Sequence, residues 1–217
     1  MINLIKKVSF KHGWYYFYRV HQPKTEELCQ SYPELCNYLE DMFENCPHEY
    51  FELEPRSSKL KFKLSNLNLI PANNHEVCEL TKQGLIENEA RYKSNHSKVQ
   101  LFMLENDTNT IAIEVPLWLQ PEEIEIYENL FQSKNPLTGH IDLIRIENNK
   151  IWIWDYKPNA SREKYASTQV YFYALMLSKR TGIPLEKFRC GYFDSNDCYI
   201  FKPESHHLET NQLLITE

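Results

Sequence analysis

Two apolar segments joined by a short asparagine turn constrain the fold more than any other feature of this 217-residue chain. Residues 139–146 and 150–157 are rich in Ile and Trp. Asn148 and Asn149 between them tolerate the positive φ angles that a two-residue hairpin turn requires. Apolar residues occupy both faces of each segment, so we expect both strands to be buried on both sides. The sequence therefore predicts a hairpin in the centre of a covered sheet.

The turn also sets which positions of the predicted hairpin face each other. Asp142 falls opposite Asp155, with Cβ atoms about 5 Å apart, and Lys157 falls opposite His140. Two carboxylates this close repel each other and raise one pKa unless a cation lies between them. The pair therefore predicts a site for Mg²⁺ or Mn²⁺, which favour oxygen ligands and complete their shells with substrate phosphate.

Lys157 adds a second chemical group to this predicted site. An ion held by the two acids can polarise a scissile phosphate and lower the pKa of a bound water. Lys157 can orient that water or stabilise negative charge on the phosphorane. The alternative is an exposed sheet face on which Lys157 neutralises solvated acids. The apolar neighbours argue against it, because unpaired acids in a buried sheet are costly.

The same segments resemble the motifs of a known family. GHID (139–142) and WDYK (154–157) are similar to the G-x-h-D and D-h-K motifs of the RecB-like exonuclease branch of the PD-(D/E)XK nuclease superfamily, where h is apolar. QVYFY (169–173) resembles the QxxxY helix motif of that branch. The resemblance covers about residues 76–202. It implies an α/β (α+β) fold with a restriction-endonuclease-like core, in which helices flank a mixed central sheet.

The resemblance also implies a set of site residues. Gln169 and Tyr173 are one helical turn apart, so both can point at the active site or the DNA backbone. The predicted catalytic residues are Asp142, Asp155, Lys157, Glu87, Gln169 and Tyr173, and the predicted metal ligands are Asp142, Asp155 and Glu87.

Glu87 enters this set through a departure from the family pattern. A helix before the sheet supplies a further His or Glu in the family, often four residues after a Gly. Here position 88 is Asn, with acids on both sides. Glu87 shares the face of Gly84 better than Glu89 does, so we expect Glu87 to be the ligand. Glu114 ends a strand-like segment in a position similar to a family Glu, where it lies at the site's edge or neutralises a basic neighbour.

The charge is unevenly distributed along the chain. A net charge of −6 argues against a large phosphate-binding surface. Residues 22–56 hold two Lys or Arg against nine acids, whereas residues 150–192 hold eight against three. We therefore expect DNA, as a single strand or at ends, to lie against the C-terminal half. The predicted nucleic-acid-binding residues are His140, Arg162, Lys164, Tyr165, Gln169 and Tyr173.

The rest of the chain shows alternating strand and helix patterns. Segments 6–11 and 14–20 predict an N-terminal hairpin. The other expected elements are helices from Thr25 and over 33–43, a strand-like alternation at 60–64, a helix over about 76–93, a strand over about 110–115, an acidic segment over 116–128, a helix over about 163–181 that ends at Gly182, and strands over 189–193 and 198–202. We divide the chain into an N-terminal β/α extension of unknown role (1–70), a nuclease core (71–205) and a loose tail (206–217).

Six cysteines are present, and no two have the spacing of a zinc knuckle or redox motif. This favours reduced thiols in the core over an iron–sulfur cluster. No apolar run is long enough for a signal peptide or a membrane span, so we expect a cytoplasmic protein that does not contact a membrane. The acidic N-terminal part is suited to shielding the site, binding a basic protein partner or forming a dimer, and nothing in the sequence ranks these three.

Two functions remain after these considerations. The first is a metal-dependent nuclease that hydrolyses DNA phosphodiester bonds, as an exonuclease or at flaps and ends, in DNA repair, recombination or defence. The second is a nuclease-fold module with weak or lost catalysis that binds nucleic acid or a protein partner. The complete D…DxK set favours the enzyme. The preference for DNA or RNA, the polarity and the choice of exo- or endonucleolytic action depend on the shape of the site.

Overall fold

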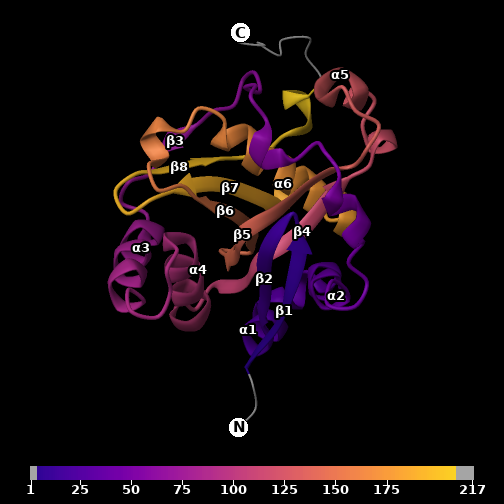
Figure 1. Cartoon of the computed structure of the whole chain (residues 1–217). Helices are drawn as coiled ribbons and strands as arrows, with labels where there is room; N and C mark the ends of the chain where they lie inside the picture. Colours follow the sequence, from indigo (N-terminus) through magenta and orange to yellow (C-terminus); the bar gives the residue numbers. More distant parts are fainter. Residues whose placement is uncertain (1–3, 209–217) are drawn as a thin grey trace.

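A single mixed sheet organises the molecule (Figure 1). The computed structural model describes residues 4–208, and within them the strands form one eight-stranded sheet. Its order is β1 (Ile5–His12), β2 (Trp14–His21), β4 (Thr110–Leu119), β5 (Leu137–Glu147), β6 (Lys150–Tyr156), β7 (Phe188–Phe193), β8 (Cys198–Phe201) and β3 (Ile70–Pro71). β6 and β7 run parallel, and the other neighbours are antiparallel. The predicted mixed central sheet is confirmed.

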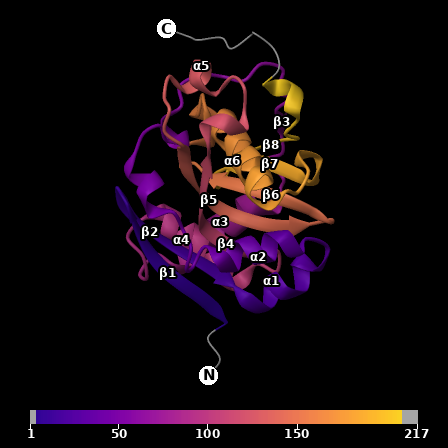
Figure 2. The same cartoon turned by 90° about the vertical axis from the view of Figure 1, so that its right-hand side faces the viewer.

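Helices cover both faces of this sheet (Figures 1 and 2). They are α1 (Gln22–Leu28), α2 (Pro33–Asp41), α3 (Glu76–Glu87), α4 (Asn95–Asn106), α5 (Tyr127–Phe131) and α6 (Ala166–Thr181). Short 3₁₀ helices are η1 (Cys29–Ser31), η2 (His48–Glu52), η3 (Ser57–Lys59), η4 (Pro121–Glu123), η5 (Ala160–Arg162), η6 (Leu185–Lys187) and η7 (Ser205–His207). α2 and α6 belong to one hydrophobic cluster and α3 and α4 to a second cluster across the sheet.

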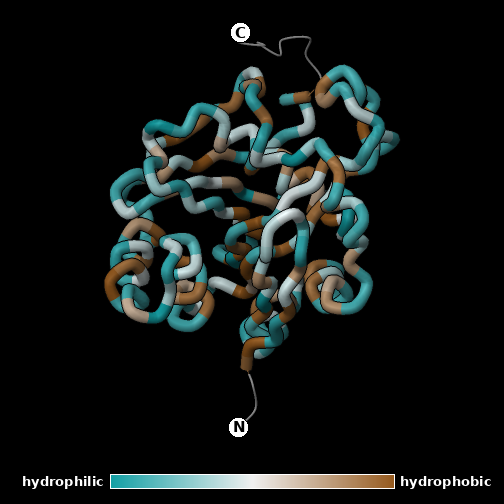
Figure 3. The backbone as a smooth tube through the Cα atoms, in the orientation of Figure 1, coloured by the Kyte–Doolittle hydropathy of each residue, from teal (hydrophilic) through white to brown (hydrophobic). Residues whose placement is uncertain are grey.

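The central strands are buried because helices lie on both of their faces. Nearly all side chains of β5 and β6 are buried. The parallel step from β6 to β7 needs a crossover, and α6 supplies it. Hydrophobic segments gather in the interior of the molecule, and hydrophilic segments lie at its periphery (Figure 3). The β5–β6 hairpin, which carries Asp142 and Asp155, is therefore held in place by packing on both of its faces.

Both predicted hairpins are confirmed. Asn148 and Asn149 have φ angles of 49° and 55°, and Leu143 pairs with Trp154 in the predicted register. β1 and β2 pair along their whole length around Gly13, whose φ is 77°. β2 also pairs with β4, so the N-terminal hairpin continues the same sheet.

The predicted helix over about 76–93 is confirmed over Glu76–Glu87 but ends earlier than expected, and a second helix that was not predicted, α4, begins at Asn95. α3 ends at Glu87, where Asn88 caps it with a buried side chain that donates to the Lys98 carbonyl oxygen at 2.9 Å. Ser94 then begins α4 by accepting from the amide of Ser97 at 3.1 Å. Asn and Ser side chains compete for backbone groups in this way and so mark helix ends.

Two further expectations need correction. The predicted strand over 110–115 continues to Leu119 and includes Pro116, so the first part of the expected acidic segment 116–128 is strand. The alternation at 60–64 forms no strand. Instead Thr168 of α6 accepts from the amide of Leu64 at 3.3 Å and donates to the carbonyl of Phe62 at 2.8 Å. A helix side chain thus holds this segment on both sides of Lys63, which forms only an isolated bridge.

The predicted loose tail is only partly described by the structure. Of the predicted loose tail 206–217, only residues 206–208 are described, and His207 there is buried against Tyr171. The rest of that tail lies outside the described residues.

Between residues 4 and 208, no helix is long and apolar enough to cross a membrane. All six cysteines are free thiols, and five of them are buried.

Candidate active site

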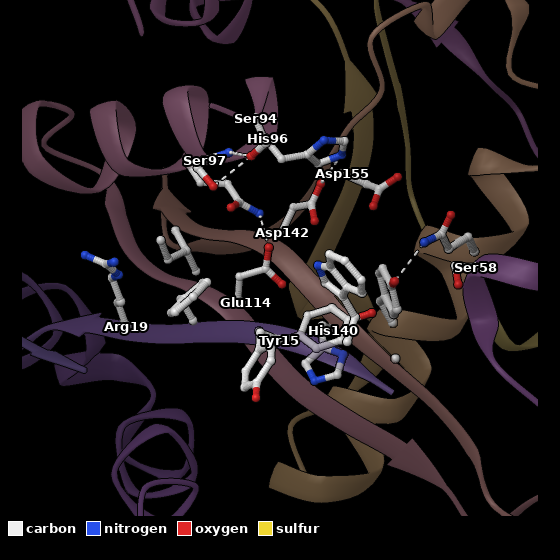
Figure 4. A pocket seen from close by; sticks show the side chains of 18 of the residues that line it. Tyr15, Arg19, Ser58, Ser94, His96, Ser97, Glu114, His140, Asp142 and Asp155 are labelled. Carbon is white, nitrogen blue, oxygen red and sulfur yellow. Dashed lines mark hydrogen bonds and ion pairs between the residues drawn. The ribbon is translucent and has the colours of Figure 1, made fainter. Parts of the chain in front are cut away.

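Three carboxylates from neighbouring strands meet at one end of the central sheet. The β4–β5 register brings Glu114 opposite Asp142, and the β5–β6 register, continued by one residue, brings Asp155 to the other side of Asp142. Figure 4 shows the three side chains converging. Asp142 and Asp155 are buried and Glu114 is partly buried. The predicted pairing of Asp142 with Asp155 therefore gains a third acid.

The carboxyl groups are poorly compensated. Burial and the neighbouring Asp155 raise the pKa of Asp142 to about 6. Burial and the neighbouring Asp142 raise the pKa of Glu114 to about 8. Glu114 also has an unusual backbone, with a φ of 53°, and its carboxylate accepts from the Gln100 amide at 2.7 Å. Strained backbone of this kind persists only where the surrounding structure imposes it.

Lys157 is the cation closest to the acids. Its Nζ lies 2.7 Å from Asp155 Oδ2 and donates to Gln169 Oε1 at 2.9 Å. The Gln169 amide in turn donates to the Tyr173 hydroxyl at 2.7 Å. Burial lowers the pKa of Lys157, but Asp155 and Asp142 outweigh it and raise this pKa above its ordinary value. Lys157 is therefore held as an ammonium between Asp155 of β6 and Gln169 of α6.

Gly139 allows these α6 side chains to reach the acids. A Cβ at Gly139 would overlap the ring of Tyr173 and the hydroxyl of Ser57. The first residue of the GHID segment is thus a point of close approach to the last residue of QVYFY. The two segments that looked separate in the sequence form one packed unit.

α4 contributes groups that the sequence analysis did not identify. His96 Nε2 lies 3.9 Å from Asp142 Oδ2, and the His96 ring packs edge-on against Tyr156. Gln100, one turn later, holds Glu114. A signal for this helix was present, because Ser94 precedes apolar residues at helical spacing from Val99 onward.

The structure does not bring Glu87 to the acids. Glu87 is exposed at the end of α3 and does not line the cavity described below. The α3 face that packs inward carries the buried Asn88 and Gly84, where an added Cβ would crowd the side chain of Phe102 in α4. Because this face is filled by helix–helix packing with α4, no α3 carboxylate reaches the site. His96 occupies the position for which Glu87 was expected.

A cavity of about 650 Å³ opens over the acids. Its lining includes most of the predicted residues: Asp142, Asp155, Lys157, His140, Gln169 and Tyr173. It also includes two cations that the sequence analysis missed, Arg19 and Arg56, and the aromatic residues 14–17. Arg162, Lys164 and Tyr165 lie outside the lining, on and beyond η5, so the structure does not gather them with the acids.

His140 joins the N-terminal hairpin to the acid-bearing strand. Its Nε2 lies 2.9 Å from His12 Nδ1, and its ring stacks on Tyr16 with the two centroids 3.7 Å apart. Burial, His12 and Arg56 lower the pKa of His140 well below its ordinary value, so the ring is neutral. The neutral His140 ring thus holds the N-terminal hairpin against β5. Contact of His140 with nucleic acid stays a prediction.

These residues fit a hard divalent cation. Three carboxylates face one ammonium, and burial, followed by the neighbouring carboxylate, raises the pKa values of Glu114 and Asp142. Carboxylate oxygens with one imidazole form a donor set that Mg²⁺ or Mn²⁺ accepts. Glu114, Asp142, Asp155 and His96 are the groups placed to hold such an ion.

Comparison with protein families agrees with this site. A model of the PD-(D/E)XK nuclease superfamily matches residues 37–213, which is most of the chain. Comparisons with curated proteins and with solved structures gave no match. The matched span includes the acid-bearing hairpin, α4 and α6, and the mixed sheet is that of a restriction-endonuclease-like core. The chain belongs to the PD-(D/E)XK nuclease superfamily.

Proposed function

We propose that this protein is a Mg²⁺- or Mn²⁺-dependent deoxyribonuclease that hydrolyses phosphodiester bonds at DNA ends or flaps. The single observation that carries the proposal is the set of three carboxylates beside the partly buried ammonium of Lys157, at the floor of an open cavity. A structural ion pair needs no such cavity. The resemblance of GHID, WDYK and QVYFY to the RecB-like branch supports the same activity, and it suggests work in DNA repair, recombination or defence.

The carboxylates of Glu114, Asp142 and Asp155, with His96, are the proposed metal ligands. The Asp142 carboxylate accepts from the backbone amide of Tyr156 at 2.8 Å, which fixes its direction. A bound divalent ion would polarise the scissile phosphate and lower the pKa of a water molecule. The Tyr156 amide contacts only Oδ2 of Asp142 and the Gln100 amide only Oε1 of Glu114, and both acids line the cavity.

Lys157 has a different proposed role. Because its pKa is raised, it carries a proton at neutral pH and cannot accept one from water. Its ammonium can instead donate to a phosphate oxygen and stabilise the charge that develops there. Gln169 and Tyr173 hold Lys157 in place from α6. We therefore assign Gln169 and Tyr173 as positioning residues.

The shape of the cavity supports action at ends. Residues of β2 line one wall and residues of α4 another, so a nucleic acid reaches the acids between two fixed elements. A chain end or an unpaired flap can enter such a space more readily than a continuous duplex. This argument favours an exonuclease or flap-directed enzyme over a restriction-type one.

The test is cleavage of end-labelled single- and double-stranded DNA with Mn²⁺, Mg²⁺ or EDTA. We expect metal-dependent cleavage by the wild type and a loss of at least about a hundredfold in Asp155→Ala and Lys157→Ala. Glu87→Ala, an exposed acid outside the cavity, is the matched control and should cleave normally. Short products from the first minutes would indicate an exonuclease.

The alternative function is a module that binds nucleic acid or a protein without cutting. Absence of cleavage by folded wild-type protein with every metal would establish that alternative and refute the nuclease. Cleavage that persists in Asp155→Ala would show that another protein in the sample is responsible.

A further inference from the structure

We propose that the β1–β2 hairpin binds a single strand of DNA and leads it to the acid cluster. The inference rests on the proposed function, because it names the form of substrate that the same site receives. It also gives the N-terminal extension a role.

The first observation is a group of exposed aromatic side chains. Trp14, Tyr15 and Phe17 are 76%, 58% and 51% exposed. All three line the cavity that contains Asp142 and Asp155. Large rings are costly to leave in water, and rings grouped at a cavity edge mark a binding site. Unpaired bases stack on such rings without regard to sequence.

The second observation is the charge on the same hairpin. Residues 1–21 contain four Lys or Arg and no acid. The register places Lys11 opposite Tyr15 and Lys7 opposite Arg19, so these three cations share one face of the hairpin with the rings of Tyr15 and Phe17. In the described part of the chain, Lys7, Lys11 and Arg19 take part in no ion pair. Arg19 Nε is buried without a hydrogen-bond partner.

The opposite face of the hairpin is already occupied. Lys6 pairs there with Glu40 and lies over the ring of Phe43. Tyr18 donates its hydroxyl proton to the carbonyl of Leu39 in α2. The acidic segment 22–56 thus packs against one face, while the basic and aromatic face stays open. This division explains how a chain of net charge −6 can still present cations to a phosphate backbone.

The hairpin is also held at a fixed position relative to the acids. His12 and Tyr16 both contact His140, two residues before Asp142 on β5. Figure 4 shows Tyr15 and Arg19 along one side of the cavity and the acids in its centre. A strand stacked on the hairpin therefore has its backbone led toward the acids. A duplex offers no free base faces to these rings, so the surface selects single strands.

The experiment measures binding without cleavage, by fluorescence anisotropy in EDTA. The probe is a fluorescein-labelled oligothymidine of about 20 nucleotides, long enough for a site of this size. The double variant Tyr15→Ala with Phe17→Ala should bind at least about tenfold more weakly. Ile86→Ala is the matched control, because Ile86 is an exposed apolar residue of α3 outside the cavity. It should bind like the wild type.

The charges are tested by the salt dependence of the same binding. The double variant Lys7→Ala with Lys11→Ala should lower the slope of log affinity against log salt by about 0.7 for each lysine. Lys6→Ala, on the occupied face, should leave the slope unchanged. Circular dichroism and thermal melting confirm that each variant is folded. A duplex of the same length should bind more weakly than the single strand.

The outcomes separate this proposal from the nuclease itself. Unchanged oligothymidine binding by Tyr15→Ala with Phe17→Ala, in a protein that cleaves DNA, refutes the hairpin surface and leaves the nuclease intact. Equal binding of single strand and duplex, insensitive to the aromatic variant, also refutes it. Loss of binding in that variant, in a protein that cuts nothing, supports the hairpin surface and refutes the nuclease.

Discussion

β5 carries two charge clusters that differ in how their carboxylates are paired. Arg145, three residues after Asp142, is fully buried and pairs with Asp107, Glu147 and Glu76. The Arg145–Asp107 contact is bidentate, at 2.8 and 3.2 Å. Burial raises the pKa of Asp107, but Arg145 outweighs it and the net pKa is lowered. Each of these three carboxylates pairs with Arg145, although burial raises the pKa of Glu147, and the cluster lines no part of the cavity.

In the cluster around Asp142, only Asp155 forms an ion pair with the Lys157 ammonium. The pKa values of Asp142 and Glu114 are raised, and the group faces open space. Buried charges alone do not mark a functional site, since structural networks also contain them. The distinguishing features are the carboxylates that have no lysine or arginine partner, and the cavity. The following predictions test this difference, beginning with the largest expected effect.

Removing Arg145, the cation of the first cluster, should lower the stability of the fold more than the rate of cleavage. Arg145→Ala leaves buried carboxylates without a partner, so the free energy of unfolding should fall by about 3–5 kcal/mol. Urea denaturation of the metal-free protein measures this change. Lys157→Ala is the comparison, because it should stop cleavage at a smaller cost in stability. Wild-type stability in Arg145→Ala would contradict the structural role of its cluster.

An added methyl group at Gly139 should disturb the cluster around Asp142. Gly139→Ala forces the Tyr173 ring and Ser57 to move, which we expect to cost about 1–3 kcal/mol of stability. Because Tyr173 holds Gln169, cleavage should fall as well. Gly182→Ala is the control, since its φ of 73° makes it destabilising without a contact near the cavity. Full cleavage by Gly139→Ala would show that the position of Tyr173 does not matter for cleavage.

The assignment of His96 in place of Glu87 predicts a difference in metal affinity. His96→Ala should weaken Mn²⁺ binding by at least about tenfold, because one donor near Asp142 is lost. Glu87→Ala should leave the affinity unchanged. Isothermal titration of metal-free protein with Mn²⁺ measures both. The reverse result would restore Glu87 as the ligand.

The two clusters should respond to pH with opposite signs. The pKa of Glu114 is raised from 4.5 to about 8, so the metal-free fold loses stability as pH rises through this range. The pKa of Asp107 is lowered from 3.8, so its contribution is present at neutral pH and is lost as pH falls through its lower folded value. Melting temperatures in EDTA from about pH 2 to about pH 9 reveal both the acidic and the alkaline loss of stability.

Single substitutions show which residue causes the acidic loss of stability and which causes the alkaline loss. Glu114→Gln should flatten the decline toward alkaline pH, and Asp107→Asn should change only the acidic side. A wild-type curve with no alkaline decline would show that the acids of the site are compensated without metal.

Much of the site could be predicted because it depends on local patterns. Asn148 and Asn149 set the register of β5 and β6, and that register alone aligned Asp142 with Asp155. Gln169 and Tyr173 were predicted from the resemblance to the QxxxY motif, with helical spacing placing both on one face, and both line the cavity. The ends of α6 and of the last strands were also close to expectation, because Gly and Pro mark them.

The missed features depend on distant contacts. The break between α3 and α4 was overlooked because Asn88 looked like an ordinary helix residue, although its partner is ten residues away. Glu87 was chosen on helical spacing, but packing of α3 on α4 turned it to solvent. Arg19, Arg56 and His96 come from three separate segments, so no spacing could connect them.

The sequence by itself determined the hairpin, its register and the pairing of the two aspartates, because turn chemistry and strand alternation act over a few residues. Only the tertiary structure decided which further groups join them. β2 pairs with β4 and α4 packs beside the acids, so Glu114, His96 and the aromatic hairpin reach one cavity. Those contacts depend on how whole elements pack, and packing is set by the shape of the complete core.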